Sequence, residues 1–375
     1  MQILLTPTFI IEPQLYLAAQ FDRAFEWFQK LAAKGNGEAM YFLGEFYSQG
    51  YGHVAQNLKK GAAWRKKGMA AGDLLATLNA AYNLPQNSSL RQETLQRLFP
   101  EVLRRSEAGD VFAQNEVADM YLYGMGTKKS VEQAVYWLEK AGAAGFWRPL
   151  NKLGELYCYG EGVPMDKKKG KAYFERAAKT GYGDAEGNLA MCYYNDEPEH
   201  MDQAARYLRR AFAHGALYEG DIANILGILL LEGNGVKRDD EESFAWIQRA
   251  ADRGSVAGMN HLGIYYEKGI GTGKNRELAE EWCKKAADKG HVGAAVQYGI
   301  YMREEGNLKA SLHYFKKAAE KGDANGQTWL GSCYLYGIGT KEDKEEARKW
   351  LTKAAASGED DAKGLLEELE EAIKN

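Results

Sequence analysis

The chain has 375 residues and a formal net charge of −4, with 45% hydrophobic and 27% charged residues. This is the composition of a folded protein, and a slightly acidic charge without a long basic tract argues against nucleic acid as the main partner. The first residues are apolar but carry no positive charge, and Glu12 and Pro13 interrupt them, so we expect no signal peptide. No later apolar run reaches transmembrane length. We therefore expect a cytoplasmic protein that does not insert into a membrane.

Nearly the whole chain repeats one unit. Its clearest copy runs from Ser255 to Gly290, where small and apolar residues recur three and four positions apart on both sides of Gly269-Ile270-Gly271. This spacing predicts two amphipathic helices joined by a glycine loop. Every copy closes with a glycine, the residue best suited to the left-handed conformation that ends many helices. In chain order, the closing glycines are Gly35, Gly72, Gly109, Gly145, Gly181, Gly215, Gly254, Gly290, Gly322 and Gly358.

A second register runs through the second helix of each unit. Eight residues before the closing glycine stands a large aromatic residue, and three residues before the aromatic stands a small one; Glu101 replaces the aromatic in one unit. Because a small residue lets a neighbouring helix approach closely, we expect the rings to fill the space between units and to dominate their interfaces. The aromatics are Trp27, Trp64, Trp137, Tyr173, Tyr207, Trp246, Trp282, Tyr314 and Trp350.

The first helix of each unit has a matching register of small residues, most of them followed three positions later by a tyrosine or an apolar residue. Glycine inside a helix costs about 1 kcal/mol relative to alanine, so its recurrence indicates close contact between helix backbones. The small residues are Gly44, Ala80, Ala118, Gly154, Ala190, Gly227, Gly263, Gly299 and Gly331.

Three parts of the chain depart from the repeat pattern. Residues 1–20 are expected to form an atypical first helix that pairs with residues 21–34. The unit at residues 73–109 has Pro85 in its loop and lacks the aromatic, so we interpret it as a degenerate repeat. After Gly358, an apolar stripe and an acidic face alternate along one predicted helix, as a terminal capping helix requires.

The combined pattern is Leu-Gly-x-x-Tyr, then Gly-x-Gly, then a small residue, an aromatic and Lys-Ala-Ala-x-x-Gly. It resembles the Sel1-like repeat, a relative of the tetratricopeptide repeat with a longer loop, over about residues 21 to 358. The resemblance implies an all-α fold, a right-handed superhelical solenoid of antiparallel helix pairs. We expect an atypical N-terminal helix pair at residues 1–35 and a C-terminal capping helix at residues 359–375. The nine repeats between them are expected at residues 36–72, 73–109, 110–145, 146–181, 182–215, 216–254, 255–290, 291–322 and 323–358.

No catalytic or metal-binding motif emerges from the sequence. The segment Ile270–Lys274 resembles a phosphate-binding loop only in part, because Lys268 stands where that motif needs a glycine and Asn275 follows the lysine. The six histidines and four cysteines are scattered, without the spacing of metal ligands or of a disulfide framework. We therefore predict a non-catalytic protein that uses no cofactor and no metal.

The resemblance implies that the first helices line a concave groove. Four asparagines share one register there, and their amides could hydrogen-bond an extended peptide or, equally, the next repeat. At the position just after the small first-helix residue, acidic residues in the first half of the chain give way to isoleucines, which indicates either a docking patch or isoleucines buried by tight winding. The predicted partner-binding residues are Tyr41, Glu45, Asn115, Asp119, Asn151, Glu155, Met191, Asn224, Ile228, Asn260, His261, Ile264 and Trp329.

The favoured function is therefore a non-catalytic scaffold or adaptor that engages a partner protein through this groove. Many bacterial Sel1-like proteins are adaptors for secretion or host contact, or inhibitors that cap a toxin. The resemblance thus also implies an alternative, an immunity protein that neutralises a secreted toxin or effector. A third hypothesis is a regulatory subunit of an enzyme. The sequence leaves the partner and the oligomeric state open.

Overall fold

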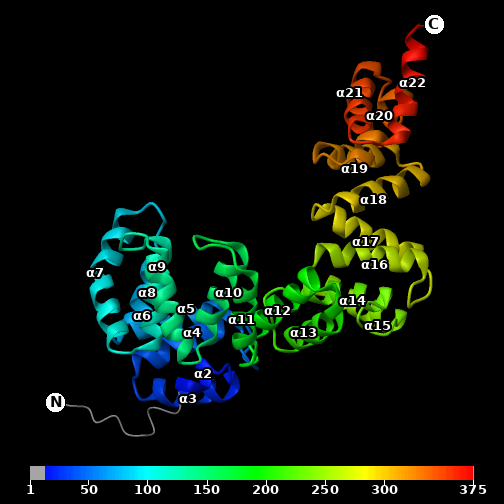
Figure 1. Ribbon diagram of the computed structural model, residues 1–375. Coiled ribbons are helices and arrows are strands. Elements are labelled where there is room, and N and C mark those ends of the chain that lie inside the picture. The colour runs from blue at the N-terminus through cyan, green and yellow to red at the C-terminus, as the bar shows by residue number, and fades with distance from the viewer. Residues whose placement is uncertain (1–12, 375) are drawn as a thin grey trace, which may run out of the picture. The chain divides into compact units, whose positions relative to one another are not determined.

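The computed structural model describes residues 13–374, and within this range it consists of helices joined by loops, without a β-strand (Figure 1). The predicted all-α fold of consecutive helix pairs is confirmed. Most of the predicted first helix, at residues 1–12, lies outside the described range. Contacts divide the chain into two compact units, one up to Leu217 and one from Tyr218 onward. None of the helices between residues 13 and 374 is both long and apolar enough to span a bilayer.

The first unit is built from consecutive helix pairs. Its helices are α2 (Pro13–Leu17), α3 (Phe21–Ala33), α4 (Gly37–Gln49), α5 (Leu58–Ala70), α6 (Leu74–Tyr82), α7 (Ser89–Glu107), α8 (Val111–Tyr123), α9 (Val131–Ala143), α10 (Trp147–Tyr159), α11 (Lys167–Ala178), α12 (Gly183–Asp196), η1 (Pro198–His200) and α13 (Met201–Ala213). The closest pairs are α4 with α5, α8 with α9, α10 with α11 and α12 with α13. We call the surface presented by α4, α6, α8, α10 and α12 the first-helix face of this unit.

The second unit continues the same pattern. Its helices are α14 (Glu219–Glu232), α15 (Asp240–Asp252), α16 (Val256–Lys268), α17 (Arg276–Asp288), α18 (Val292–Glu304), α19 (Leu308–Glu320), α20 (Ala324–Tyr336), α21 (Lys344–Ala356) and α22 (Asp360–Lys374). Consecutive pairs again pack together, and α22 packs on α21 and α20, where a capping helix would lie. The surface presented by α14, α16, α18 and α20 is the first-helix face of the second unit.

The two glycines of the loop between paired helices have different tasks. Gly269 ends α16 in the left-handed conformation, with φ of 72°, and its N–H donates to the carbonyl oxygen of Tyr265 at 2.8 Å. Gly271, with φ of 62°, lies against the first turn of α15, where a Cβ would collide with the carbonyl oxygen of Asp240. The second glycine therefore allows the loop to pack on the preceding repeat.

In most repeats, the residue after the second-helix aromatic is buried more deeply than the aromatic itself. Trp246 is 8% exposed and Ile247 0%, while Trp282 is half-buried and Cys283 only 4% exposed. Ile247 packs on Gly227, where an added Cβ would lie 2.7 Å from the isoleucine side chain. The rings in these repeats are thus not the most deeply buried residues of their helices, and their dominance of the interfaces stays a prediction.

The same contact recurs along the chain. Successive helix side chains point about 100° apart around the helix axis. The residue after the aromatic therefore faces the paired helix, and the aromatic ring lies to one side of that contact. The small first-helix residues make room for that following side chain. The recurring contacts join Gly154 to Phe174, Gly299 to Phe315, and Gly331 to Leu351.

The degenerate repeat is shifted by one residue from the predicted register. Ala81 is 2% exposed, whereas Ala80, the predicted small contact residue, is exposed to solvent. The loop here has no Gly-x-Gly signal to fix the alignment, and Leu78 and Leu95, both 0% exposed, supply the core. Counted from Gly72, Ala81 has the same spacing as the small residues of most other repeats.

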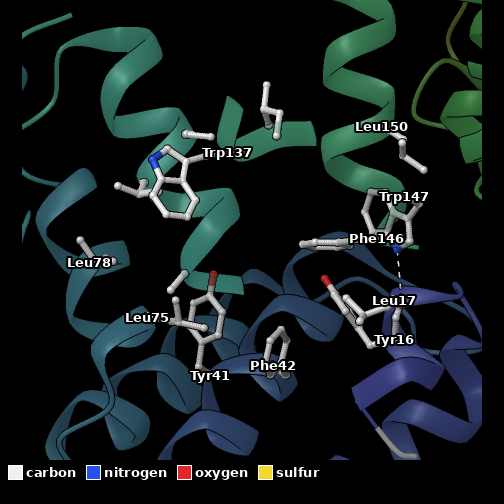
Figure 2. Packing of buried hydrophobic residues seen from close by; sticks show 14 of the residues in the cluster. Tyr16, Leu17, Tyr41, Phe42, Leu75, Leu78, Trp137, Phe146, Trp147 and Leu150 are labelled. Carbon is white, nitrogen blue, oxygen red and sulfur yellow. Dashed lines mark hydrogen bonds between the residues drawn. The ribbon is translucent and has the colours of Figure 1, made fainter. Parts of the chain in front are cut away.

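The N-terminal helix α2 contacts a repeat that lies far along the chain. Figure 2 shows Trp147 of α10 beside Tyr16 of α2, and the indole Nε1 donates to the carbonyl oxygen of Tyr16 at 3.1 Å. The Tyr16 ring is 1% exposed and packs against Phe42, Phe112 and Phe146, with centroid distances of 4.9, 6.0 and 6.3 Å. These residues belong to three different repeats, so α2 fills part of the first-helix face of its own unit.

Candidate protein-binding site

In the first unit, the chain itself covers three of the predicted partner-binding residues. Tyr41, Glu45 and Asn115 are 7%, 6% and 4% exposed, and they line a narrow pocket closed partly by Tyr16. The Asn115 amide donates to the adjacent Glu116 carboxylate at 3.4 Å. In this structure these residues serve the packing of the first unit, because α2 lies where a partner segment would enter.

Arg148 ties the charged residues of this face to the N-terminal part of the unit. Its guanidinium lies 3.6 Å from the Glu45 carboxylate and donates to the hydroxyls of Tyr51 at 3.2 Å and Tyr16 at 3.4 Å. Arg65 approaches the other oxygen of Glu45 at 3.4 Å. The buried carboxylate of Glu45 is therefore compensated from within the chain, as a buried charge requires.

The remaining carboxylates of this face are hydrogen-bonded or have raised pKa values. Glu155 accepts hydrogen bonds from Asn151 at 3.0 Å and Lys152 at 2.9 Å. Burial, together with the Asp119 carboxylate, raises the pKa of Glu116, and burial raises the pKa of Asp119, because both effects disfavour the charged form. The predicted residues that stay half-buried in this unit are Asp119, Asn151, Glu155 and Met191.

The asparagines of the shared register differ in whether their side chains hydrogen-bond to the next repeat. Asn151 accepts a hydrogen bond from Asn188 of the next repeat at 3.0 Å, and Asn224 accepts one from Nδ1 of His261, again in the next repeat, at 2.7 Å. These amides hold repeats together, which was one of the two expected roles. The side chain of Asn260, in contrast, makes no hydrogen bond to any residue in the described range and is half-buried. The sequence pattern missed Asn188, which stands one position later than the register.

A pocket opens on the first-helix face of the second unit, between α16 and α18. Asn260, Ile264 and Glu267 of α16 line one wall, and Gln297 and Tyr301 of α18 line the other. Its empty volume of about 500 Å³ includes space that is open to solvent. The remaining lining residues are Gly263, Cys283 and Gly293.

Three polar side chains lie near one another at the end of this pocket, because Tyr301 is close enough to Gln297 and Glu267 for their electrostatic influence to reach it. Burial raises the pKa of Tyr301, which is 2% exposed, so the phenol keeps its hydrogen. Burial also raises the pKa of the Cys283 thiol to about 12, and its Sγ–H donates to the carbonyl oxygen of Ala294 at 3.2 Å. The thiol is thus an inert part of the wall.

One residue of the predicted isoleucine row, Ile264, lines the same pocket. Ile228, Ile264 and Ile300 are half-buried, so neither full burial nor full exposure describes them. Trp329 of α20 is half-buried as well, and its ring stacks on Phe315 with a centroid distance of 5.3 Å. The first-helix face of the second unit therefore presents apolar surface beside the free amide of Asn260.

The described residues form no cluster of metal-binding side chains and no disulfide. Between residues 13 and 374, no group of three or more His, Cys, Asp or Glu side chains is placed to hold a metal ion. The four cysteines are free thiols in this structure.

Comparisons with solved structures support the fold. A Sel1 repeat protein from Oxalobacter formigenes is 27% identical, with a TM-score of 0.63, and the match covers 81% of this chain and 89% of that one. A protective antigen of uropathogenic Escherichia coli strains, displaying an SLR fold, is 27% identical with a TM-score of 0.66 and coverages of 92% and 74%. An immunity protein from Pseudomonas aeruginosa is 20% identical with a TM-score of 0.32 and coverages of 62% and 73%, a likeness too distant to inform function.

A comparison with curated proteins gave no match. The Sel1 repeat family model matches most of the chain, and it leaves residues 74–110, within the degenerate repeat, unmatched. The matched stretches are residues 15–36, 37–73, 111–146, 150–182, 183–215, 223–255, 256–291, 292–323 and 324–359. Their register agrees with the helix pairs, the closing glycines and the small first-helix residues described above. The chain belongs to the Sel1 repeat family.

Proposed function

We propose that this Sel1 repeat protein is a non-catalytic scaffold that binds an extended segment of a partner protein on the first-helix face of its second unit. Sel1 repeats generally act as protein-interaction scaffolds. The observation that carries the proposal is the pocket between α16 and α18, where Asn260 offers an amide with no internal hydrogen bond beside the half-buried Ile264.

This surface suits an extended segment for two reasons. An asparagine amide carries both a donor and an acceptor, so Asn260 can bond to the N–H and C=O groups of a partner backbone. Ile228, Ile264 and Ile300 provide apolar contact area at equivalent positions of neighbouring repeats, where alternate side chains of the partner can lie. The first unit offers less, because Tyr16 already occupies the corresponding surface.

Affinity capture with matched variants tests the proposal. Full-length protein is used as bait in its native cell extract, as wild type, Ile264→Asp or Leu308→Asp, and the bound proteins are identified by mass spectrometry. Leu308 is the control because it is an apolar residue of the same unit, 39% exposed, on the second helix α19. We expect Ile264→Asp to lose a specific partner that Leu308→Asp retains. Equal recovery by all three baits, with unchanged thermal melts, would reject this surface as the site.

The narrower hypotheses name different partners for the same surface. A toxin inhibitor would recover a secreted toxin or effector, whose gene is expected beside the gene for this chain. A regulatory subunit would recover an enzyme whose activity changes when this protein is added. The identity of the partner that Ile264→Asp loses decides between these two and a general adaptor.

A further inference from the structure

Glu267 is a carboxylate without an ion-pair partner in the described range, residues 13–374. It lies in the last turn of α16, on the wall of the pocket that Tyr301 lines from the other side. Arg276 lies 3.9 Å from the centroid of the Tyr301 ring but pairs with Glu304 at 2.7 Å. A half-buried carboxylate that lines a pocket without an ion-pair partner can receive a cation supplied from outside.

The surrounding atoms are also mostly hydrogen-bond acceptors. Gln297 lines the pocket, and its amide offers a carbonyl oxygen that can accept a hydrogen bond. Asn260 adds a second amide oxygen, and its side chain is free within the described range. The last carbonyls of α16 give this end of the helix partial negative charge, which also favours a cation near Glu267.

We propose that this pocket receives an arginine side chain from the partner's extended segment, with the guanidinium on Glu267 and its aliphatic stem along Ile264. This inference rests on the proposed function and adds the chemistry of the bound residue. A guanidinium carries five N–H donors and no acceptor, which matches a site of one carboxylate and two amide oxygens. The half-buried Ile264 lies on the same wall as Glu267, so the methylene groups find apolar surface on the way in.

Titration of the full-length protein with short peptides tests this assignment. The probes are acetylated and amidated Ala-Ala-X-Ala-Ala peptides with X as arginine, glutamine or glutamate, and the reporter is the δ1-methyl NMR signal of Ile264. We expect the arginine peptide to shift this signal and to bind about tenfold more tightly than the glutamine peptide, since a hydrogen bond to a charged group is lost in the latter. The glutamate peptide should bind most weakly.

Two variants and one control locate the effect. Glu267→Gln should reduce binding of the arginine peptide to that of the glutamine peptide, and Tyr301→Phe should reduce it in part, because the pocket loses a polar hydroxyl near the carboxylate. Glu281→Gln on α17 is the matched control, an exposed carboxylate that pairs with Lys285 at 2.6 Å. It should leave binding unchanged. Thermal melts of each variant confirm that the fold is retained.

The outcomes separate this inference from the proposed function. If the arginine and glutamine peptides bind equally, or if Glu267→Gln binds the arginine peptide as wild type does, the arginine site is refuted while a groove for extended segments stands. If no peptide shifts the Ile264 signal and Ile264→Asp keeps every captured partner, both proposals fail.

Discussion

The indole Nε1 of Trp147 donates a hydrogen bond to the carbonyl oxygen of Tyr16, 3.1 Å away and 131 residues earlier in the chain. In a simple repeat array each repeat contacts only its neighbours. Here the N-terminal helix α2 bridges from the first repeat to α10, and the Tyr16 ring is almost fully buried among aromatic residues. The first unit is therefore held by a long-range contact as well as by neighbour contacts.

Replacement of Tyr16 tests the strength of this closure. We expect Tyr16→Ala to lower the free energy of unfolding by about 3 kcal/mol, as for other buried aromatic truncations. Thermal denaturation of the full-length protein is the measurement, and only the transition of the first unit should move. Tyr218→Ala, at a residue 72% exposed, is the control and should change nothing. A Tyr16→Ala melt that overlays wild type would show that α2 is not part of the core.

The depth of the interface positions gives a second prediction. Phe315 is 0% exposed and packs on Gly299, whereas Trp282 is half-buried. We expect Phe315→Ala to cost about 3–5 kcal/mol and Trp282→Ala roughly half as much, because part of the indole already contacts solvent. Urea denaturation of both variants measures the difference. A larger loss of stability for Trp282→Ala would contradict this ranking and favour the ring as the dominant interface residue.

Two glycines of one loop form a matched pair for a third prediction. Gly271→Ala should destabilise the second unit by more than about 1 kcal/mol, because alanine is strained at positive φ and its Cβ collides with the Asp240 carbonyl. Gly273→Ala should be neutral or slightly stabilising, since the added Cβ would meet no neighbouring atom within 4 Å and the φ of this residue is not positive. Denaturation midpoints of the two variants decide this, and equal effects would contradict the role assigned to the second loop glycine.

Local periodicity explains how much of this fold the sequence predicts. Closing glycines and small first-helix residues act within one repeat, so they indicate the helix pairs directly. The contact between Tyr16 and Trp147 depends on rotations accumulated over several repeats, which no local pattern carries. In the degenerate repeat, the pattern predicts Ala80 as the small contact residue, whereas Ala81 is the buried one. The loop of this repeat lacks the Gly-x-Gly signal that helps to align the other copies.

The candidate site was predicted less well than the fold. The asparagine register includes Asn260, whose amide is free in the described range, but it also contains Asn151 and Asn224, which bond to the next repeat. Whether an amide is free depends on the residue opposite it, Asn188 or His261 in those cases, and that residue lies in another copy of the pattern. The sequence pattern does not single out Glu267. The role proposed for this carboxylate depends on the absence of a nearby cation in the described range, which no local pattern predicts.

The histidines of the second unit give a prediction on pH. Burial lowers the pKa of His291, and burial together with His291 lowers the pKa of His261, from the ordinary value of 6.5. The unfolded chain then binds protons more readily than the folded chain, so the free energy of unfolding should fall as the pH drops below 6.5. Urea denaturation at about pH 7.5 and about pH 5.5 measures this.

A variant isolates the contribution of one histidine. His291 caps α18 through Nδ1, which accepts the N–H of Ala294 at 3.1 Å. His291→Asn keeps a capping acceptor and removes the titrating ring, so the second unit of this variant should lose less stability on acidification. A pH dependence identical to that of wild type would show that His291 stays as easily protonated in the folded chain as in the unfolded one.

The most direct test of the central claim is site-specific cross-linking to the captured partner. A photoreactive amino acid is placed at position 264, on the first-helix face of the second unit, or at position 308 on the second helix α19. We predict a covalent adduct with the partner from position 264 and none from position 308. An adduct from position 308 without one from position 264 would contradict the account.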